Sequence, residues 1–270
     1  MGIEEVAARG LVLLGCGKMG SALLKGWLAG GLPPGAVHVL EPRPSEWLEA
    51  QGVRLGGPLP ERPAAAVVAV KPQSMGEALP AMTALGGGGT LILSIAAGTP
   101  LATFEAAFGP GTPVVRAMPN IPAAIGRGVT AMVGNARAGE ADLALAAALM
   151  GAVGEVVRLR AEDEMDAATA LSGSGPGYVF HLIEALAAAG VAEGLAPDLS
   201  LRLAAATVAG AGAMALAPGA DPAALRRDVT SPGGTTEAGL RVLMDGEAGL
   251  APLLARTVRA AAARSRELRG

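Results

Sequence analysis

The stretch "LVLLGCGKMGSALLKGWLAGG", residues 11–31, decides the fold of this chain. Leu11 to Leu14 is a short apolar run that predicts a buried strand, and Ser21 to Ala29 has the pattern of an amphipathic helix. Between them stands "GCGKMG", a G-x-G-x-x-G in the strand-to-helix context of a dinucleotide-binding loop. Its glycines provide a tight turn, a close approach for pyrophosphate and close packing of helix on strand. The loop predicted to bind the cofactor comprises Gly15, Cys16, Gly17, Lys18, Met19 and Gly20.

Downstream of this loop, short apolar runs alternate with helical patterns of about ten residues. Further strands are predicted at "AVHVLEP", "AAAVVAVKP", "TLILSIAAG", "TPVVRAMPN", "GVTAMVGN" and "EVVRL". Such alternation is typical of an α/β fold, here an N-terminal Rossmann-like doubly wound parallel sheet. From about Glu162 onward every pattern is helical. We therefore expect a dinucleotide-binding domain over residues 1–161 and an all-helical domain over residues 162–270.

Composition narrows the class of protein. The chain has 270 residues and a net charge of −3, with 51% hydrophobic but only 2% aromatic residues. Acids and bases are mixed, so no basic run predicts binding to nucleic acid or to a membrane surface. There is no long uninterrupted apolar stretch, no secretory signal at the start, and no arrangement of residues that predicts a metal site. We expect a cytoplasmic protein whose Ala-rich helical domain covers its apolar faces by forming a homodimer.

Two side chains after the second predicted strand bear on the choice of cofactor. Glu41 stands 21 residues after Gly20, where an acid binds the adenosine ribose of NAD. Arg43 could instead meet the 2′-phosphate of NADP, and Pro42 could turn Glu41 away from the site. The pattern slightly favours NADP(H) and leaves NAD(H) open. Cys16 lies at a helix start that could activate a thiol, but a small residue tolerated in a turn is the favoured interpretation.

The helical half has few groups that could act as a base. It contains one histidine, His181, and one tyrosine, Tyr178, and it has neither lysine nor cysteine. Oxidising an alcohol requires a base or a metal, whereas an imine accepts hydride if both partners are held in line. The stretch "DVTSPGGTTEAGL", residues 228–240, supplies hydroxyls, a glycine pair and a helix start, which together predict an anion cradle. A helix-to-helix turn capped by threonine is the alternative.

Six ordered motifs over nearly the whole chain resemble the pyrroline-5-carboxylate reductase family. They are "GCGKMG", "AVKPQ" at 69–73, "SIAAG" at 94–98, "RAMPNIPA" at 116–123, "EDEMDAATALSGSGPGYVF" and "DVTSPGGTTEAGLRVL". The last two are the most specific. The resemblance implies reduction of the cyclic imine 1-pyrroline-5-carboxylate to L-proline by NAD(P)H. It also implies homodimers formed by the helical domains, which in this family often assemble into decamers.

The resemblance also assigns roles to residues. Thr236 is implied as the catalytic hydroxyl nearest the imine nitrogen. Substrate binding is assigned to Ser231, Gly233, Gly234, Thr235, Thr236 and Glu162, and cofactor binding also to Ala69, Val70, Lys71, Pro72, Ala97 and Asn120. For Glu162 a helix-capping carboxylate is an equal alternative. Ser172 and Ser174 are interpreted as part of a close-packed turn, because no base stands at a suitable spacing.

Four positions depart from the common family pattern: Ile121, Gly177, Asp228 and Thr235. None of them removes a hydrogen-bond donor to which a role is assigned. Two other functions stay open on the sequence alone. One is reduction of another cyclic imino acid, because pocket volume is not readable from sequence. The other is a non-catalytic dinucleotide sensor, which would have no need of Thr236 and the glycine pair.

Overall fold

The computed structural model describes residues 2–268 of the chain. They form two compact units, which are described separately. The first unit contains the residues up to Gly173 together with those from Ala262 onward, and the second is Ser174–Ala261. The domain boundary between residues 161 and 162 stays a prediction. In the division into compact units, residues 162–173 belong to the first unit.

A single sheet of eight strands forms the centre of the first unit within the described residues, in the order β3-β2-β1-β4-β5-β6-β7-β8. The strands are β1 Leu11–Leu14, β2 Val37–Leu40, β3 Arg54–Leu55, β4 Ala65–Val68, β5 Leu91–Ser94, β6 Val114–Met118, β7 Gly128–Gly134 and β8 Gly154–Arg158. β1 pairs in parallel with both β2 and β4, so the strand order reverses there. The predicted α/β doubly wound class is confirmed.

One part of the sheet differs from the expected parallel arrangement. β7 runs antiparallel to β6, and β8 then runs parallel to β7. Between β6 and β7 lie only residues 119–127, which include a short 3₁₀ turn, Ile121–Ile125. A parallel crossover needs a dozen or more residues. The chain therefore turns back on itself and extends the sheet with two reversed strands.

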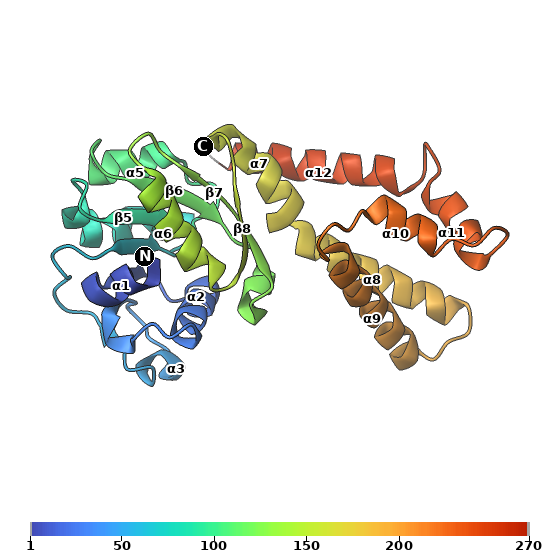
Figure 1. Cartoon of the computed structure of the whole chain (residues 1–270), viewed down its shortest axis with the longest axis horizontal. Coiled ribbons are helices and arrows are strands. Elements are labelled where there is room, and N and C mark those ends of the chain that lie inside the picture. Colours follow the sequence, from blue (N-terminus) through green and yellow to red (C-terminus); the bar gives the residue numbers. More distant parts are fainter. Residues whose placement is uncertain (1, 269–270) are drawn as a thin grey trace. The chain divides into compact units, whose positions relative to one another are not determined.

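Helices cover both faces of the sheet (Figure 1). They are α1 Gly2–Arg9, α2 Lys18–Ala29, α3 Glu46–Glu49, α4 Met75–Ala78, α5 Leu101–Phe108, α6 Glu140–Gly151 and α7 Met165–Ala168. Alternate strand residues point to opposite faces. Leu11 and Leu13 pack with α1, α2 and α6, whereas Val12 and Leu14 pack with α4 and α5. α2 begins three residues earlier than its pattern predicted, and α1 and β3 were not predicted.

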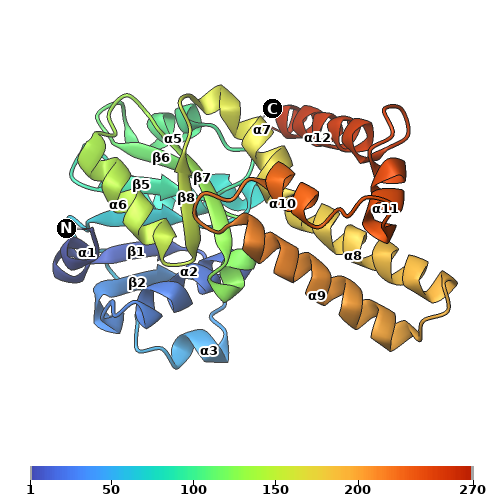
Figure 2. The same cartoon turned by 45° about the vertical axis from the view of Figure 1, so that its right-hand side comes forward.

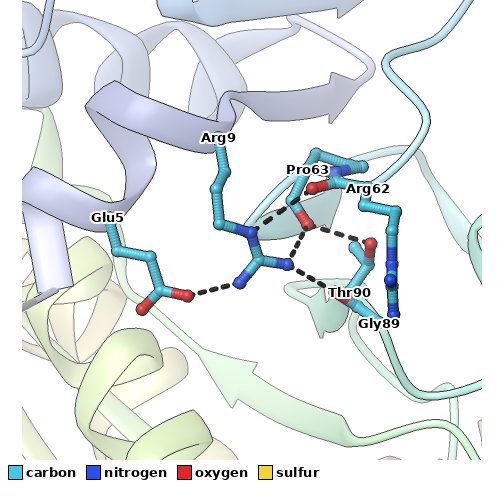
Figure 3. A network of polar contacts seen from close by, with 6 residues as sticks. All are labelled: Glu5, Arg9, Arg62, Pro63, Gly89 and Thr90. Carbon is cyan, nitrogen blue, oxygen red and sulfur yellow. Dashed lines mark hydrogen bonds and ion pairs between the residues drawn. The ribbon is translucent and has the colours of Figure 1, made fainter.

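The arginine at the end of α1 ties this helix to two loops at the start of strands (Figure 3). Arg9 Nη2 donates to the carbonyl oxygens of Pro63 at 3.2 Å and Gly89 at 2.5 Å, while Nη1 pairs with the Glu5 carboxylate. Thr90 Oγ1 also donates to the Pro63 carbonyl oxygen, at 2.9 Å. Pro63 and Gly89 precede β4 and β5, so Arg9 satisfies backbone acceptors at the edge of the sheet opposite the glycine loop.

The second unit is helical, and no strand follows β8 in the described residues, as predicted. Its helices are α8 Gly175–Ala192, α9 Pro197–Ala215, α10 Pro222–Asp228, α11 Thr235–Leu243 and the first part of α12 Leu250–Glu267. α8 and α9 lie side by side (Figure 2). A Cβ on Gly190 would lie 2.2 Å from Ser200 Oγ, so a larger residue there would displace the serine side chain. Small residues thus allow close packing in this pair of helices.

Apolar side chains remain exposed along the second unit. No residue of α8 is buried, and Phe180 on this helix is 55% exposed. An apolar helix of a folded chain usually buries one face. The single chain therefore leaves a large apolar surface uncovered. Among the helices of residues 2–268, none has both the length and the apolarity needed to cross a membrane.

Candidate active site

The predicted cofactor residues gather at one edge of the sheet. Gly15 follows β1, Glu41 follows β2, Ala69 to Pro72 follow β4, Ala97 follows β5 and Asn120 follows β6. These five strands are mutually parallel. Their carboxyl ends therefore lie at the same edge, on both sides of the point where strand order reverses between β1 and β4. Ligands of open α/β sheets bind at this position.

The three glycines of the loop differ in what a side chain at each position would meet. Gly15 has a φ of +88°, and a Cβ there would lie 2.9 Å from Val70 Cγ1. A Cβ on Gly20 would lie 2.4 Å from the Gly15 carbonyl oxygen. On Gly17 it would meet no protein atom within 4 Å. Gly15 and Gly20 are thus required by the protein itself, whereas Gly17 leaves open space in front of the α2 amino terminus, where an anion fits.

Glu41 is turned toward the glycine loop and not away from it. Its Oε2 accepts a hydrogen bond from the Cys16 backbone N–H at 2.9 Å, and its Oε1 accepts one from the Arg43 N–H at 3.2 Å. The expectation that Pro42 could turn this side chain away is therefore wrong. Arg43 is exposed beside it. Both the acid that suits NAD and the base that suits NADP thus stand at the end of β2.

The Cys16 thiol is not an activated nucleophile. Burial, and secondly the negative charge of Glu41, raise its pKa to about 11 from an ordinary value of 9.0. Since a raised pKa keeps the thiol protonated, Cys16 should carry about a hundredfold less thiolate at pH 8 than an ordinary cysteine. This agrees with the favoured interpretation of Cys16 as a small residue in a turn.

We expect iodoacetamide to alkylate the folded protein far more slowly at pH 8 than a model thiol, with the rate still rising above pH 10. Cys16 is the only cysteine of the chain, so mass spectrometry reports on it alone. The urea-unfolded protein is the control and should react at the ordinary rate. Equal rates for folded and unfolded protein would contradict the protonated thiol.

Glu162 forms an ion pair with a buried arginine. Its Oε1 accepts from Arg116 Nη1 at 2.8 Å and from the Leu101 backbone N–H at 2.9 Å. The Arg116 side chain is only 3% exposed, and that of Glu162 28%. Glu162 thus caps α5 and neutralises an arginine of β6. Sequence reasoning did not single out Arg116, although an arginine within the apolar run "TPVVRAMPN" signals a buried partner.

Asn120 is also occupied by backbone groups. Its Oδ1 accepts from the Val129 N–H at 2.9 Å, and its Nδ2 donates to the Ser172 carbonyl oxygen at 3.1 Å. The side chain thereby joins the end of β6 to β7 and to the π-helical turn Thr169–Gly173. Its assignment to the nicotinamide region stays a prediction.

The predicted substrate residues of the second unit lie in the connection from α10 to α11. Gly233 has a φ of +71°, and Gly234 is the N-cap residue of α11. Ser231, Thr235 and Thr236 are exposed. The first backbone hydrogen bond of α11 runs from the Ala238 N–H to the Gly234 carbonyl oxygen, at 3.2 Å. In the described chain the N–H groups of residues 235–237 have no acceptor, so they point toward any anion in front of this loop.

The predicted site residues therefore fall into two groups. The cofactor residues and Glu162 belong to the first unit, and the loop from Ser231 to Thr236 belongs to the second. His181 is not a convincing base, because its side chain is 82% exposed and pairs with Glu184 at 3.2 Å. The loop from Ser231 to Thr236 contains no basic side chain. Its donors suit hydride transfer to an electrophile that carries an anionic group.

Comparisons with known proteins agree with this chemistry. Residues 162–268 match a family model described as pyrroline-5-carboxylate reductase dimerisation. The pyrroline-5-carboxylate reductase of Methanosarcina acetivorans is 39% identical to this chain, with 94% of this chain and 96% of the relative covered. That of Glycine max is 40% identical, with 96% and 95% covered.

Solved structures give the same result. A pyrroline-5-carboxylate reductase from Coxiella burnetii superposes with a TM-score of 0.90 at 32% identity, covering 97% of this chain and 99% of the other. The pyrroline carboxylate reductase of Plasmodium falciparum, solved with NADP bound, has a TM-score of 0.82 at 27% identity, covering 97% and 98%.

Proposed function

Because this chain belongs to the pyrroline-5-carboxylate reductase family, we propose that it reduces 1-pyrroline-5-carboxylate to L-proline with NAD(P)H, the last step of proline biosynthesis. The observation that carries the proposal is the loop 231–236, which offers hydroxyl and N–H donors without a base. An imine that carries a carboxylate needs such donors and no strong base.

The cofactor is a nicotinamide dinucleotide, NADP(H) with NAD(H) as the alternative. Gly17 leaves the space that a pyrophosphate needs, and the amino terminus of α2 faces it. Around this cradle we place Lys71 and Ala97, both exposed at the same edge of the sheet, with Asn120 toward the nicotinamide. When bound, the reduced cofactor supplies a hydride to the imine carbon.

The chain's own residues have the tasks of holding the substrate and supplying a proton. The backbone N–H groups behind Gly234 and the hydroxyls of Ser231 and Thr235 would bind the substrate carboxylate. The Thr236 hydroxyl would donate to the ring nitrogen, which gains a proton as its carbon gains hydride. Glu162 is assigned to the same substrate, although its carboxylate is already bonded to Arg116. The proposed contact with substrate would therefore be made by the other carboxylate oxygen of Glu162, Oε2.

The protein acts as a homo-oligomer, since most of its second half matches the dimerisation model. The finer part of the proposal is that helical domains of two subunits interlock, and that dimers assemble further, up to a decamer. The exposed apolar surface of α8 supports an extensive interface. We place the protein in the cytoplasm, as expected from the sequence.

The function is tested by following NADPH or NADH absorbance after addition of pyrroline-5-carboxylate, and separately of a six-membered cyclic imine. The five-membered substrate should give the larger kcat/KM. A preference for the six-membered ring would establish the alternative substrate class. Failure of folded protein to turn over any imine would leave a dinucleotide-binding protein without this activity.

Replacing Thr236 with alanine should lower kcat/KM for pyrroline-5-carboxylate by about ten- to a hundredfold. A hydrogen bond made in the transition state contributes roughly 1–3 kcal/mol. Thr236→Ser keeps the hydroxyl and should retain most of the activity. Full activity in Thr236→Ala would exclude the proton-donating role.

A further inference from the structure

An acid in the first turn of α11 reaches back to the glycine pair. Glu237 Oε2 accepts a hydrogen bond from the Gly233 backbone N–H at 2.6 Å. One residue later, the Gly234 N–H donates to the Ser231 carbonyl oxygen at 3.0 Å. The loop is therefore held at two successive N–H groups, while the next three point outward. Without such bonds a glycine pair has more backbone freedom than any other dipeptide.

We propose that Glu237 is a positioning residue for the substrate loop, holding Gly233 in its left-handed conformation so that the cradle is formed before substrate binds. The inference rests on the proposed function of this loop. The position of Glu237 favours its hydrogen bond to the Gly233 N–H, because an acid in the first turn of a helix interacts well with the helix dipole. Preorganised donors bind an anion more tightly than donors that must first be ordered.

The same carboxylate has an opposing effect. Its negative charge lies at the cradle, with Oε2 only 2.6 Å from the Gly233 nitrogen, and would repel the carboxylate of the substrate. Glu237 also lines a cavity of about 450 Å³ between α10 and α11 together with three arginines. These are Arg226, Arg227 and Arg241. Arg227 is paired with Asp221 at 3.8 Å. Arg226 and Arg241 therefore remain to offset the charge of Glu237, so that its hydrogen bond can be kept without excluding an anionic substrate.

The two effects can be separated by substitution. Glu237→Gln keeps an acceptor for the Gly233 N–H and removes the charge, so the KM for pyrroline-5-carboxylate should equal the native value or fall below it. Glu237→Ala removes the bond, and Glu237→Asp keeps the charge on a side chain one methylene shorter. Both should raise this KM about tenfold, with kcat and the KM for NADPH within about twofold.

Two controls accompany these variants. Glu247→Gln removes one charge from an exposed position after α11. It should leave kcat and both KM values unchanged. Gly233→Ala strains the left-handed residue itself, and the double variant with Glu237→Ala should be no worse than the more impaired single one. Thermal unfolding of each variant distinguishes an altered loop from an unfolded protein.

An unchanged KM in Glu237→Asp, or an equal rise in Glu237→Gln and Glu237→Asp, would overturn the inference. Glu237→Asp and Glu237→Gln decide the question even if the alanine variant fails to fold. Because all values are compared with a native enzyme that turns over the imine, such a result would leave the proposed function intact. Absence of native turnover would instead count against the proposed function.

Discussion

Replacing Glu162 with alanine should lower the free energy of unfolding by about 3–5 kcal/mol, because it leaves a buried guanidinium without its partner. Arg116 is 3% exposed and its Nη1 bonds Glu162 at 2.8 Å. The Leu101 N–H at the start of α5 would lose its acceptor as well. Urea unfolding followed by circular dichroism measures the change.

A matched control is available in the same unit. Glu140 pairs with Arg158 at 2.7 Å, but the two side chains are 83% and 44% exposed. Glu140→Ala should therefore cost only about 0–1 kcal/mol. Similar losses for the two alanine variants would contradict a structural role for the buried pair.

Glu162→Gln separates stability from substrate binding. The amide oxygen can still accept from Arg116 and Leu101, so this variant should lose less stability than Glu162→Ala. If the folded Glu162→Gln enzyme also shows a higher KM for pyrroline-5-carboxylate, the predicted contact with substrate gains support. An unchanged KM would leave Glu162 with its structural role alone.

Alanine at Gly20 should weaken NADPH binding roughly a hundredfold, about 2.8 kcal/mol, and also lower stability, because the clash moves the loop backbone that faces the pyrophosphate. Its Cβ would lie 2.4 Å from the Gly15 carbonyl oxygen, a backbone atom that cannot move without the loop. NADPH fluorescence titration and the midpoint of thermal unfolding measure the two effects.

Gly17→Ala is the informative comparison. Its Cβ would meet no protein atom within 4 Å, and its φ of −68° suits alanine. Stability should therefore be unchanged, while the affinity for NADPH falls about tenfold or more because the methyl group occupies the place of the pyrophosphate. Unchanged affinity in a stable Gly17→Ala protein would mean that the cofactor does not approach the backbone here.

Much of the fold could be predicted from short-range patterns. The apolar run Leu11–Leu14 is strand β1 with the predicted bounds, and the predicted strand "GVTAMVGN" contains β7, Gly128–Gly134. α1 was missed because it has only eight residues, of which Val6 alone is buried, so its apolar pattern is weak. β3 was missed because it has only two residues, both exposed. The reversal of β7 depends on the length of its connection, which the alternation of strands and helices does not report.

Part of the site could also be predicted from short-range patterns. Glycines at fixed spacing encode the loop Gly15–Gly20 locally, and hydroxyls beside a glycine pair mark the loop at Ser231–Thr236. The structure places the cofactor residues at one edge of the sheet because parallel strands end together. The role of Glu162 in the ion pair could not be chosen beforehand, since its partner in β6 is 46 residues away.

The sequence by itself determined most of the strands and helices, the glycine loop and the family. These depend on periodicity and on residue types at fixed spacing. Only the tertiary structure decided which partner each polar side chain takes. Glu41 bonds the Cys16 N–H across 25 residues, and Ser265 bonds Asp166 across 99. Such bonds form where packed elements bring a donor within about 3 Å of an acceptor, and no local pattern encodes that distance.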